Sequence, residues 1–356
     1  MKQIDNILLS ENDSIKKALE IIDRGALKIA LIVDNNKKLL GTVTDGDIRR
    51  GLLKGVSLED QVSLVMHKNP FVAKMSESRD LILKKALEKK IYQIPIVDEN
   101  GIVIGIEVIE ELIKPKEKNN KVILMVGGLG TRLRPLTEKV PKPLLKVGDK
   151  PILETIIENF KKYGFVNFIL TINYKGEMIK DYFKDGSKFG VNIEYVEEKK
   201  RMGTAGSLSL LKERPKEPFF VMNGDLLTTL NYEHFLDYHI SNNSIATMAV
   251  KEYEIQVPFG VVNLEDNRIV SIEEKPIHKF FVNAGIYVLS PECLDYIPKD
   301  EYFDMPSLFK KLIEDNKKTV SFPIREYWMD IGRLEEYERA NREYWNYFGG
   351  EDEANS

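Results

Sequence analysis

Short apolar runs alternate with amphipathic segments through the later part of the chain. Residues 122–126, 168–172 and 219–222 are nearly continuous apolar runs of strand length, as strands buried on both faces have. Residues 153–163 and 334–344 carry apolar positions at helical spacing. This alternation predicts an α/β domain with a doubly wound, mostly parallel sheet, in which ligands bind beyond the carboxyl ends of the strands.

The first part of the chain contains an internal repeat. At a constant offset of 64 residues, Ile32-Val33-Asp34 corresponds to Ile96-Val97-Asp98, and Leu40-Gly41 corresponds to Ile104-Gly105. Each copy has the pattern of a helix, a strand ending in Val-Asp, a turn, a second strand and a further helix. Two copies of about 55 residues are too few for a solenoid, so the pattern predicts one pseudo-symmetric α+β module.

A polar, highly charged segment that contains one proline, residues 114–120, separates the repeat from the rest of the chain. We therefore predict an N-terminal domain at 1–116, with repeats at about 1–58 and 62–116, and a second domain at 117–348. Both are long enough to bury a core, and 43% of the 356 residues are hydrophobic. Residues 349–356 are expected to be a disordered tail.

The segment Gly127-Gly128-Leu129-Gly130 comes directly after the first apolar run, where a strand ends and the chain turns. Glycines let main-chain N–H groups approach an anion closely, and Arg132 and Lys142 supply two cations nearby. Leu133 stands where a dinucleotide fingerprint needs its third glycine, and no Gly-Lys-Ser/Thr sequence closes the turn as in a P-loop. The pattern favours a phosphate site, with an ordinary tight turn as the alternative for the glycines alone.

The segment from Gly127 to Thr137, together with Pro141-Lys142-Pro143, resembles the signature of the sugar-phosphate nucleotidyltransferases. Further motifs resemble that family and occur in its order: Gly203-Thr204-Ala205-Gly206-Ser207, Asn223-Gly224-Asp225, Glu273-Glu274-Lys275-Pro276, Asn283-Ala284-Gly285-Ile286-Tyr287 and Trp328-Met329-Asp330-Ile331-Gly332. Taken singly, each has a plainer explanation as a turn, a solvated charge cluster or a helix cap. The resemblance implies the nucleotide-diphospho-sugar transferase fold and transfer of a nucleotidyl group from an NTP to a hexose or amino-hexose 1-phosphate, with release of pyrophosphate.

The resemblance also implies roles for individual residues. Nucleotide binding is expected at Gly127, Gly128, Gly130, Thr131, Tyr174, Gly203, Thr204 and Gly224. Sugar-phosphate binding is expected at Glu274, Lys275, Asn283 and Gly285. Arg132 and Lys142 are the expected catalytic cations, and Asp225 and Asp330 are expected to hold Mg²⁺.

Elementary chemistry agrees with a site that needs no general base. A sugar 1-phosphate is largely dianionic at neutral pH, so the nucleophile carries no proton that must be removed. The obstacle is repulsion, since two unit charges about 4 Å apart repel by roughly 4 kcal/mol at an effective dielectric constant near 20. A magnesium ion on two carboxylates, together with the two cations, offsets this repulsion. The four histidines therefore need no catalytic role.

The residues Gly41 to Arg50 of the first repeat resemble the CBS motif, whose threonine and aspartate bind the phosphate and ribose of a nucleotide. The resemblance implies a tandem CBS pair with a regulatory nucleotide site at Thr44 and Asp47. In the second repeat Val108 stands opposite Thr44 and Glu111 opposite Asp47, so one hydroxyl is missing there. A homodimer or higher oligomer is expected, and a packing module without ligand is the alternative.

The identity of the base is the finest expectation. The glycine segment is closest in form to mannose 1-phosphate guanylyltransferases and to CBS-fused relatives that make GDP-amino-sugars for surface glycans, which favours GTP. Tyr174 is expected where thymidylyl relatives carry a base-reading glutamine, counting back from Asp185-Gly186-Ser187. Uridylyl relatives share the form of the glycine segment, so UTP or another NTP stays open.

Composition and charge bear on the partners, the cellular compartment and the alternative functions of the chain. A net charge of −4 with interspersed signs gives no reason to expect nucleic acid or a membrane as partner, and no apolar run approaches membrane-spanning length. The single Cys293 fits a reducing cytoplasm, and it lies in no catalytic cysteine loop of the kind an inosine-type dehydrogenase with a CBS pair would need. A catalytically silent nucleotide sensor would be expected to lack one of the four charged residues at 132, 142, 225 and 330, and all are present.

Overall fold

The computed structural model describes residues 4–25 and 27–349, which fold as two compact units divided between Pro115 and Lys116. The tail expected to be disordered lies, beyond Gly349, outside these residues. Within the described ranges, none of the helices combines the length and apolarity that a bilayer crossing requires.

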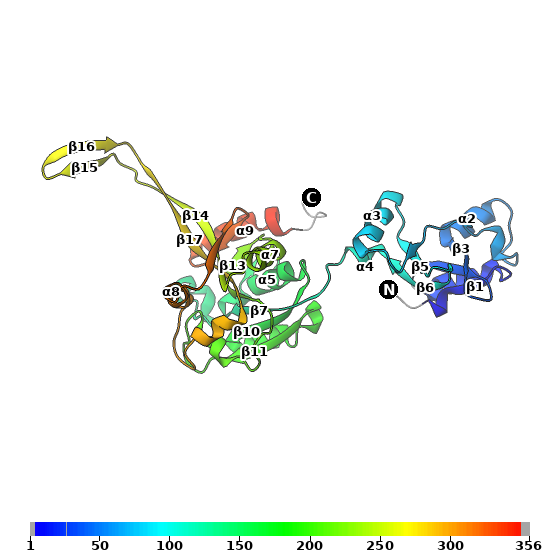
Figure 1. The fold of residues 1–356 in the computed structure, drawn as a ribbon, viewed down its shortest axis with the longest axis horizontal. Helices are drawn as coiled ribbons and strands as arrows, with labels where there is room; N and C mark the ends of the chain where they lie inside the picture. The colour runs from blue at the N-terminus through cyan, green and yellow to red at the C-terminus, as the bar shows by residue number, and fades with distance from the viewer. Residues whose placement is uncertain (1–3, 26, 350–356) are drawn as a thin grey trace. The chain divides into compact units, whose positions relative to one another are not determined.

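The first unit repeats one arrangement of elements at the offset of 64 residues (Figure 1, blue to cyan). The first copy contains β1 (Leu8–Ser10), α1 (Ile15–Arg24), β2 (Ile29–Val33), β3 (Leu39–Thr44) and α2 (Asp45–Leu53). The second copy contains β4 (Ala73–Lys74), α3 (Arg79–Lys89), β5 (Gln93–Val97), β6 (Val103–Val108) and α4 (Ile109–Ile113). Each copy forms its own three-stranded sheet, in the orders β1-β2-β3 and β4-β5-β6.

Helix caps explain both the likeness of the two copies and their main difference. Ser14 and Ser78 accept hydrogen bonds from the main-chain N–H groups of Lys17 and Leu81, so α1 and α3 begin alike. Thr44 caps α2 in a capping box, whereas Val108 has no hydroxyl to cap α4. Consistent with this loss, α4 has 5 residues and α2 has 9.

The two copies share part of their hydrophobic core. Ile29 and Leu31 of β2 pack in one cluster with Val97 of β5 and Val103 of β6. The main-chain N–H of Leu39 also donates to the carbonyl oxygen of Gly101 at 3.1 Å. Each copy therefore buries apolar surface that it could not bury alone, which makes the pair one folding unit.

The second unit is built on a seven-stranded sheet in the order β11-β10-β7-β12-β17-β14-β18. Its strands are β7 (Lys118–Met125), β10 (Phe165–Ile172), β11 (Asn192–Glu197), β12 (Phe219–Asn223), β14 (Ala246–Gln256), β17 (Ile277–Leu289) and β18 (Thr319–Ile324). All neighbouring strands pair in parallel except at β17, which is antiparallel to both β12 and β14. The mostly parallel sheet predicted from the sequence is confirmed.

Helices cover both faces of this sheet. One face packs against α5 (Ile152–Lys161), α6 (Gly176–Phe183), α7 (Tyr232–Ser241) and α9 (Leu334–Phe348), and the other packs against α8 (Met305–Glu314) and two 3₁₀ segments. Each strand contributes side chains to both faces, because successive side chains of a strand point to opposite faces of the sheet. Val122 and Leu124 belong to the first cluster and Ile123 to the second. The doubly wound α/β class is therefore confirmed.

The connector between the units is shorter than the sequence suggested. The strand β7 begins at Lys118, inside the polar segment expected to be linker. Asn120 is buried, and its side-chain amide donates to the carbonyl oxygen of Pro218 at 2.7 Å. A polar residue can thus extend a central strand when a specific partner satisfies it.

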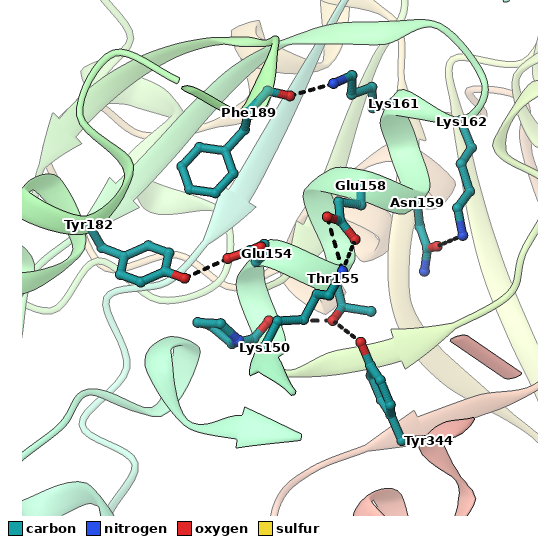
Figure 2. A network of polar contacts seen from close by, with 11 residues as sticks. Lys150, Glu154, Thr155, Glu158, Asn159, Lys161, Lys162, Tyr182, Phe189 and Tyr344 are labelled. Atoms are coloured by element: carbon teal, nitrogen blue, oxygen red, sulfur yellow. Dashed lines mark hydrogen bonds and ion pairs between the residues drawn. The ribbon is translucent and has the colours of Figure 1, made fainter. Parts of the chain in front are cut away.

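Polar contacts around α5 join segments that are distant in the chain (Figure 2). Lys150, on a short hairpin of β8 (Lys146–Val147) and β9 (Lys150–Pro151), forms an ion pair with Glu158 at 2.9 Å. Tyr182 of α6 donates to Glu154 at 2.6 Å, and Thr155 lies 3.3 Å from the hydroxyl of Tyr344 on α9. The contact between Thr155 and Tyr344 holds α9 in place. This helix follows β19 (Trp328–Asp330), the strand that carries the candidate site residue Asp330.

A two-stranded arm projects from the second unit (Figure 1, yellow). It is formed by β14 and β17, whose ladder continues from Val250 opposite Asn283 to Gln256 opposite Ile277. At its far end a smaller hairpin joins β15 (Val261–Glu265) to β16 (Arg268–Glu273). The side chains at positions 252–256 and 277–281 of the arm are exposed.

Candidate active site

The glycine turn lies directly after β7, at the carboxyl edge of the sheet. Gly130 has a φ of 62°, and a Cβ there would stand 2.9 Å from Thr137 Cγ2, so both conformation and space require glycine. The Thr137 hydroxyl donates to the Gly130 carbonyl oxygen at 2.8 Å and holds the turn closed. A Cβ at Gly128 would meet open space, so its main chain faces the groove that a ligand would enter.

The two predicted cations stand on either side of this turn. Lys142 begins a 3₁₀ segment and is buried, and its ammonium lies 2.5 Å from the Oδ2 atom of Asp225. Arg132 extends toward Gly332, where a Cβ would stand 3.3 Å from one guanidinium nitrogen. Glycine at 332 therefore leaves space for the guanidinium group next to the segment that carries Asp330.

The two predicted metal carboxylates come from adjacent strands. Asp225 comes directly before β13 (Leu226–Thr228), and Asp330 ends β19, which pairs with β13 so that Leu226 stands opposite Asp330. The N–H of Ile331 donates to the main-chain oxygen of Asp225 at 3.0 Å. Desolvation raises the pKa of Asp330, the nearby charge of Asp225 raises it further, and Lys142 and Arg132 act in the opposite direction.

A groove of about 470 Å³, a volume suited to a small ligand, connects the glycine turn with Arg132, Lys142 and Asp225. The predicted residues that line it are Gly127, Gly128, Gly130, Thr131, Arg132, Lys142, Gly203, Thr204 and Asp225. A second groove of about 390 Å³ shares Thr204 and Asn223 with the first and contains Asn283, Gly285 and Asp330. The structure thus brings most of the predicted site to one continuous region at the strand ends.

Hydrogen bonds shape the second groove. The side chain of Asn283 donates to the Tyr287 hydroxyl at 2.7 Å and accepts from the N–H of Gly285 at 2.9 Å. Gly285 has a φ of 72°, and a Cβ there would stand 2.7 Å from the Asn223 amide nitrogen. Asp304 receives the N–H of Thr204 at 2.9 Å and so fixes the loop between the two grooves.

The carboxylate of Glu198 lines the first groove, and the sequence interpretation missed it. Glu198 comes directly after β11, and its main-chain oxygen accepts from the side chain of Asn173 at 2.7 Å. Burial raises the pKa of Glu198, while hydrogen bonds from Thr171, Met202 and Ser207 lower it. The signal that could have revealed it is an acidic residue directly after a strand, the same signal that marked Asp225.

Arg201 also lines the first groove, within the basic run 199–201 that the sequence interpretation did not use. Its side chain is exposed, so its guanidinium group is accessible to a phosphate in the groove. The groove therefore has three cationic side chains, at positions 132, 142 and 201.

Two predicted nucleotide residues lie differently from expectation. Tyr174 is not among the described residues that line either groove, and the ammonium of Lys175 stacks on its ring at 5.2 Å. Its neighbour Asn173, directly after β10, and Glu198, directly after β11, both line the first groove, and a role for Tyr174 in reading the base stays a prediction. Gly224 is a packing residue, since a Cβ there would stand 2.3 Å from Val126 Cγ1.

The Glu274-Lys275 pair lies outside both grooves. These two residues come after β16, at the outer end of the arm, and both side chains are exposed. That they bind the sugar phosphate stays a prediction, and in this single chain both residues lie away from the second groove. The physical reason is the unbroken β14–β17 ladder, which carries them away from Asn283.

The predicted nucleotide residues of the first repeat serve a helix cap in this structure. The Thr44 hydroxyl donates to Asp47 at 2.6 Å, and Asp47 forms an ion pair with Arg50. A cavity of about 290 Å³ lies instead in the second repeat, lined by residues that include Lys74, Arg79 and Glu111. Thr44 and Asp47 do not line that cavity.

Comparison with known proteins supports the arrangement of both units. The family model described as nucleotidyl transferase matches residues 121–346, and the CBS domain model matches residues 2–54 and 61–106. The chain belongs to the nucleotidyl transferase family. Its N-terminal unit is a tandem CBS pair.

Curated relatives of this family member differ in the base that their names specify. A probable mannose-1-phosphate guanylyltransferase 1 of Oryza sativa subsp. japonica is 36% identical over 235 residues, covering 63% of this chain and 64% of the relative. A UTP–glucose-1-phosphate uridylyltransferase of Synechocystis is 33% identical over 244 residues, covering 62% of each chain. This chain therefore spans less than two thirds of the length of these relatives.

Solved structures share the fold of the second unit. HddC from Yersinia pseudotuberculosis, also solved in complex with GMP-PN, is 25% identical with a TM-score of 0.50, covering 63% of this chain and 99% of HddC. A putative glucose-1-phosphate thymidylyltransferase from Bacillus anthracis is 23% identical with a TM-score of 0.52, covering 62% of this chain and 94% of that one. At this identity the thymidylyltransferase supports the fold alone.

Proposed function

We propose that this chain transfers a nucleotidyl group, with GTP as the preferred donor, to a hexose or amino-hexose 1-phosphate. The products are an NDP-sugar, suited to surface glycan synthesis, and pyrophosphate. The observation that carries the proposal is the convergence of Lys142, Asp225 and Asp330 in front of the glycine turn. Family membership supports the same reaction class.

The reaction needs positioning and charge neutralisation more than proton transfer. A phosphate oxygen of the sugar 1-phosphate attacks the α-phosphorus, and the bond between the α-phosphorus and the bridging oxygen breaks to release pyrophosphate. The N–H groups of the glycine turn hold the phosphates, and Arg132 neutralises the departing pyrophosphate. Lys142 stabilises charge on the α-phosphate and its leaving oxygen. Arg201 adds a third cation for the triphosphate.

The acidic pair fits a magnesium ion. Asp225 and Asp330 offer carboxylate oxygens, and only one ammonium group, that of Lys142, lies in contact with them in the described part of the chain. Within the described ranges, no group of three or more histidine, cysteine or acidic side chains could hold a metal. The protein would thus supply two ligands and leave the others to water and substrate phosphates. When bound, Mg²⁺ neutralises phosphate charge.

The preference for guanine is supported by Glu198. A carboxylate only accepts hydrogen bonds, whereas a glutamine both donates and accepts. Guanine presents two adjacent donors, N1–H and the N2 amino group, which match two acceptor oxygens. Uracil and thymine present one donor between two acceptors, which match an amide better. The names of the guanylyltransferase relatives and the GMP-PN complex of HddC favour the same base.

The test is the donor preference of Glu198→Gln. We expect the ratio of kcat/KM for GTP to that for UTP to fall about 10- to 100-fold, because an amide donor would face a guanine donor. Glu197→Gln is the matched control, since Glu197 is exposed and pairs with Lys180. Pyrophosphate release is measured with each NTP and a panel of hexose 1-phosphates. A wild-type preference for UTP, or an unchanged ratio in Glu198→Gln, would refute the assignment of guanine.

The N-terminal unit is proposed to regulate this reaction. Thr44 and Asp47 would bind a nucleotide if the capping contact between them opened, and the cavity of the second repeat offers Lys74 and Arg79 to a phosphate. The measurement is the rate of pyrophosphate release with free nucleoside phosphates added. An unchanged rate, thermal stability and oligomeric state would contradict a sensing role.

A further inference from the structure

The hairpin at the end of the arm has one apolar face without a partner among the described residues. Val262 pairs with Ile272 and Leu264 pairs with Ile269, so these four side chains lie on the same face. They are 44%, 64%, 63% and 58% exposed, respectively. An isolated two-stranded hairpin is marginally stable in water, and contiguous exposed apolar surface marks an interaction site. This face therefore requires a surface to cover it.

The arm itself also exposes large side chains. Tyr253 pairs with Phe280 and Ile255 pairs with His278, which puts Tyr253, Ile255 and Phe280 on one face. Each of the three is about half exposed, at 52%, 49% and 52%. The opposite face holds Lys279 in ion pairs with Glu252 and Glu254 at 2.9 and 2.6 Å. That face also exposes Phe281 and Ile277, so the arm is a strand pair with exposed apolar side chains on both faces.

The groove at the base of the arm needs a cation that it does not contain. Its described lining includes the acidic residues Asp304 and Asp330 and no lysine or arginine. On the proposed function, on which this inference rests, a dianionic sugar phosphate must lie beside these acids. Lys275, which the sequence motif assigns to this phosphate, is at the outer end of the arm instead.

Lys275 cannot reach the groove of its own chain while the arm stays paired. Asn283, at the groove, is six positions along a continuous strand from Ile277, and at about 3.3 Å per position the two are about 20 Å apart. Lys275 lies two residues further out, where the N–H of Val257 donates to the Pro276 carbonyl oxygen at 3.0 Å. A lysine side chain is a stem of four carbons, which is far shorter than this distance.

We propose that two copies of this chain exchange arms, so that Lys275 of each copy enters the sugar-phosphate groove of the other. A two-fold axis across the arms brings the outer end of each arm to the base of its partner, and such an interface is self-complementary. The exchange buries the apolar faces of both arms. It also brings a lysine to a groove whose described lining has no lysine or arginine.

Mixed dimers of differently tagged chains test the exchange. One chain carries Lys275→Ala and the other carries Asp225→Ala, and each homodimer is expected to lose on the order of 100-fold in turnover. In the mixed dimer, the groove with an intact Asp225 receives the arm with an intact Lys275. Turnover should therefore recover to about half that of the wild type. A mixed dimer no more active than its parents would overturn the proposal.

A second mixed dimer serves as a control, because it should stay inactive if the arms are exchanged. Here a wild-type chain is paired with a chain that carries both substitutions. With exchanged arms, the intact groove receives the arm without Lys275, so turnover stays near that of the Lys275→Ala homodimer. If each arm served its own groove, this dimer would have about half the wild-type turnover, and the exchange would be wrong.

A structural measurement separates this inference from the proposed function. Chains carrying Lys275→Cys are mixed with chains carrying Ser307→Cys in the groove, and a short thiol cross-linker is added. Native Cys293 is buried, and burial raises its pKa to about 12, so background reaction is small. Cross-linked heterodimers are expected whether or not the wild-type protein releases pyrophosphate. Cross-linking without any pyrophosphate release would refute the proposed function and leave the exchange of arms supported. Their absence at a concentration where the protein is dimeric would refute the exchange.

Discussion

Replacing Lys142 by methionine removes the ammonium group and keeps most of the side-chain volume. In the structure this ammonium lies 2.5 Å from Asp225, and the two side chains are 10% and 28% exposed. Breaking a fully buried pair by removing one partner costs about 3–5 kcal/mol. Because solvent reaches part of Asp225, we expect Lys142→Met to lower the free energy of unfolding by about 2 kcal/mol. For a domain of this size, that corresponds to a fall in Tm of about 4–8 °C.

Magnesium should stabilise Lys142→Met more than it stabilises the wild type. In the wild type, an ion that binds Asp225 must compete with the ammonium of Lys142, whereas in Lys142→Met the carboxylates are free of that competition. Mg²⁺ should therefore raise the Tm of the variant more than that of the wild type, although turnover falls by about 100- to 1000-fold. The assay is thermal unfolding with and without Mg²⁺, alongside pyrophosphate release.

A double-mutant cycle makes the reasoning refutable. Asp225→Asn removes the carboxylate charge, so adding Lys142→Met to it should cost much less than Lys142→Met alone. A coupling energy below about 0.5 kcal/mol would mean that the ion pair contributes little to the fold. Equal effects of Mg²⁺ on the wild type and Lys142→Met would contradict a metal at this carboxylate.

Two further predictions concern buried positions of the second unit. Burial lowers the pKa of His239 from 6.5 to about 4. As pH falls, this histidine is therefore protonated in the unfolded chain before it is protonated in the folded one. About 3 kcal/mol of the free energy of unfolding that is present above pH 6.5 is lost by pH 4. The free energy of unfolding of His239→Gln should vary less with pH over this range, whereas that of His234→Gln, on the exposed side of α7, should vary as in the wild type. Equal pH dependence in all three proteins would show that His239 does not cause the loss of stability. Gly224→Ala should lower the free energy of unfolding by about 1–3 kcal/mol and lower turnover, because the new methyl group would meet Val126 at 2.3 Å. A variant of wild-type stability and rate would show that the strand end adjusts freely.

The strand ends could be predicted because two simple rules agree there. Apolar runs located β7 and β12, and the rule that parallel strands present ligand groups at their carboxyl ends placed Gly127 and Asp225 at one edge. Asp330 reaches the same place through the antiparallel β13–β19 pair, which no local pattern revealed. Motif order, rather than periodicity, therefore brought the second carboxylate into the prediction.

The features that the sequence did not reveal depend on loop length and on long-range pairing. Tyr174 and Glu198 both come after strands of the same sheet, and only the course of the chain after β11 shows which one lines the groove. The hairpin at the end of the arm has a local signature, since Leu264 lies between Asn263 and Glu265, and Ile272 lies between Ser271 and Glu273. That this hairpin stands at the end of the β14–β17 ladder, with Lys275 away from the second groove, results from pairing between residues far apart in sequence.

The apolar cluster shared by the two CBS repeats sets the boundary at which the protein can be divided. A fragment cut between the repeats would leave Ile29 and Leu31 facing water in one piece, and Val97 and Val103 in the other. A cut at Pro115 leaves that cluster whole. Gene fusions that join this CBS pair to another enzyme must therefore transfer both repeats together, since a single repeat would expose its part of the shared cluster to water.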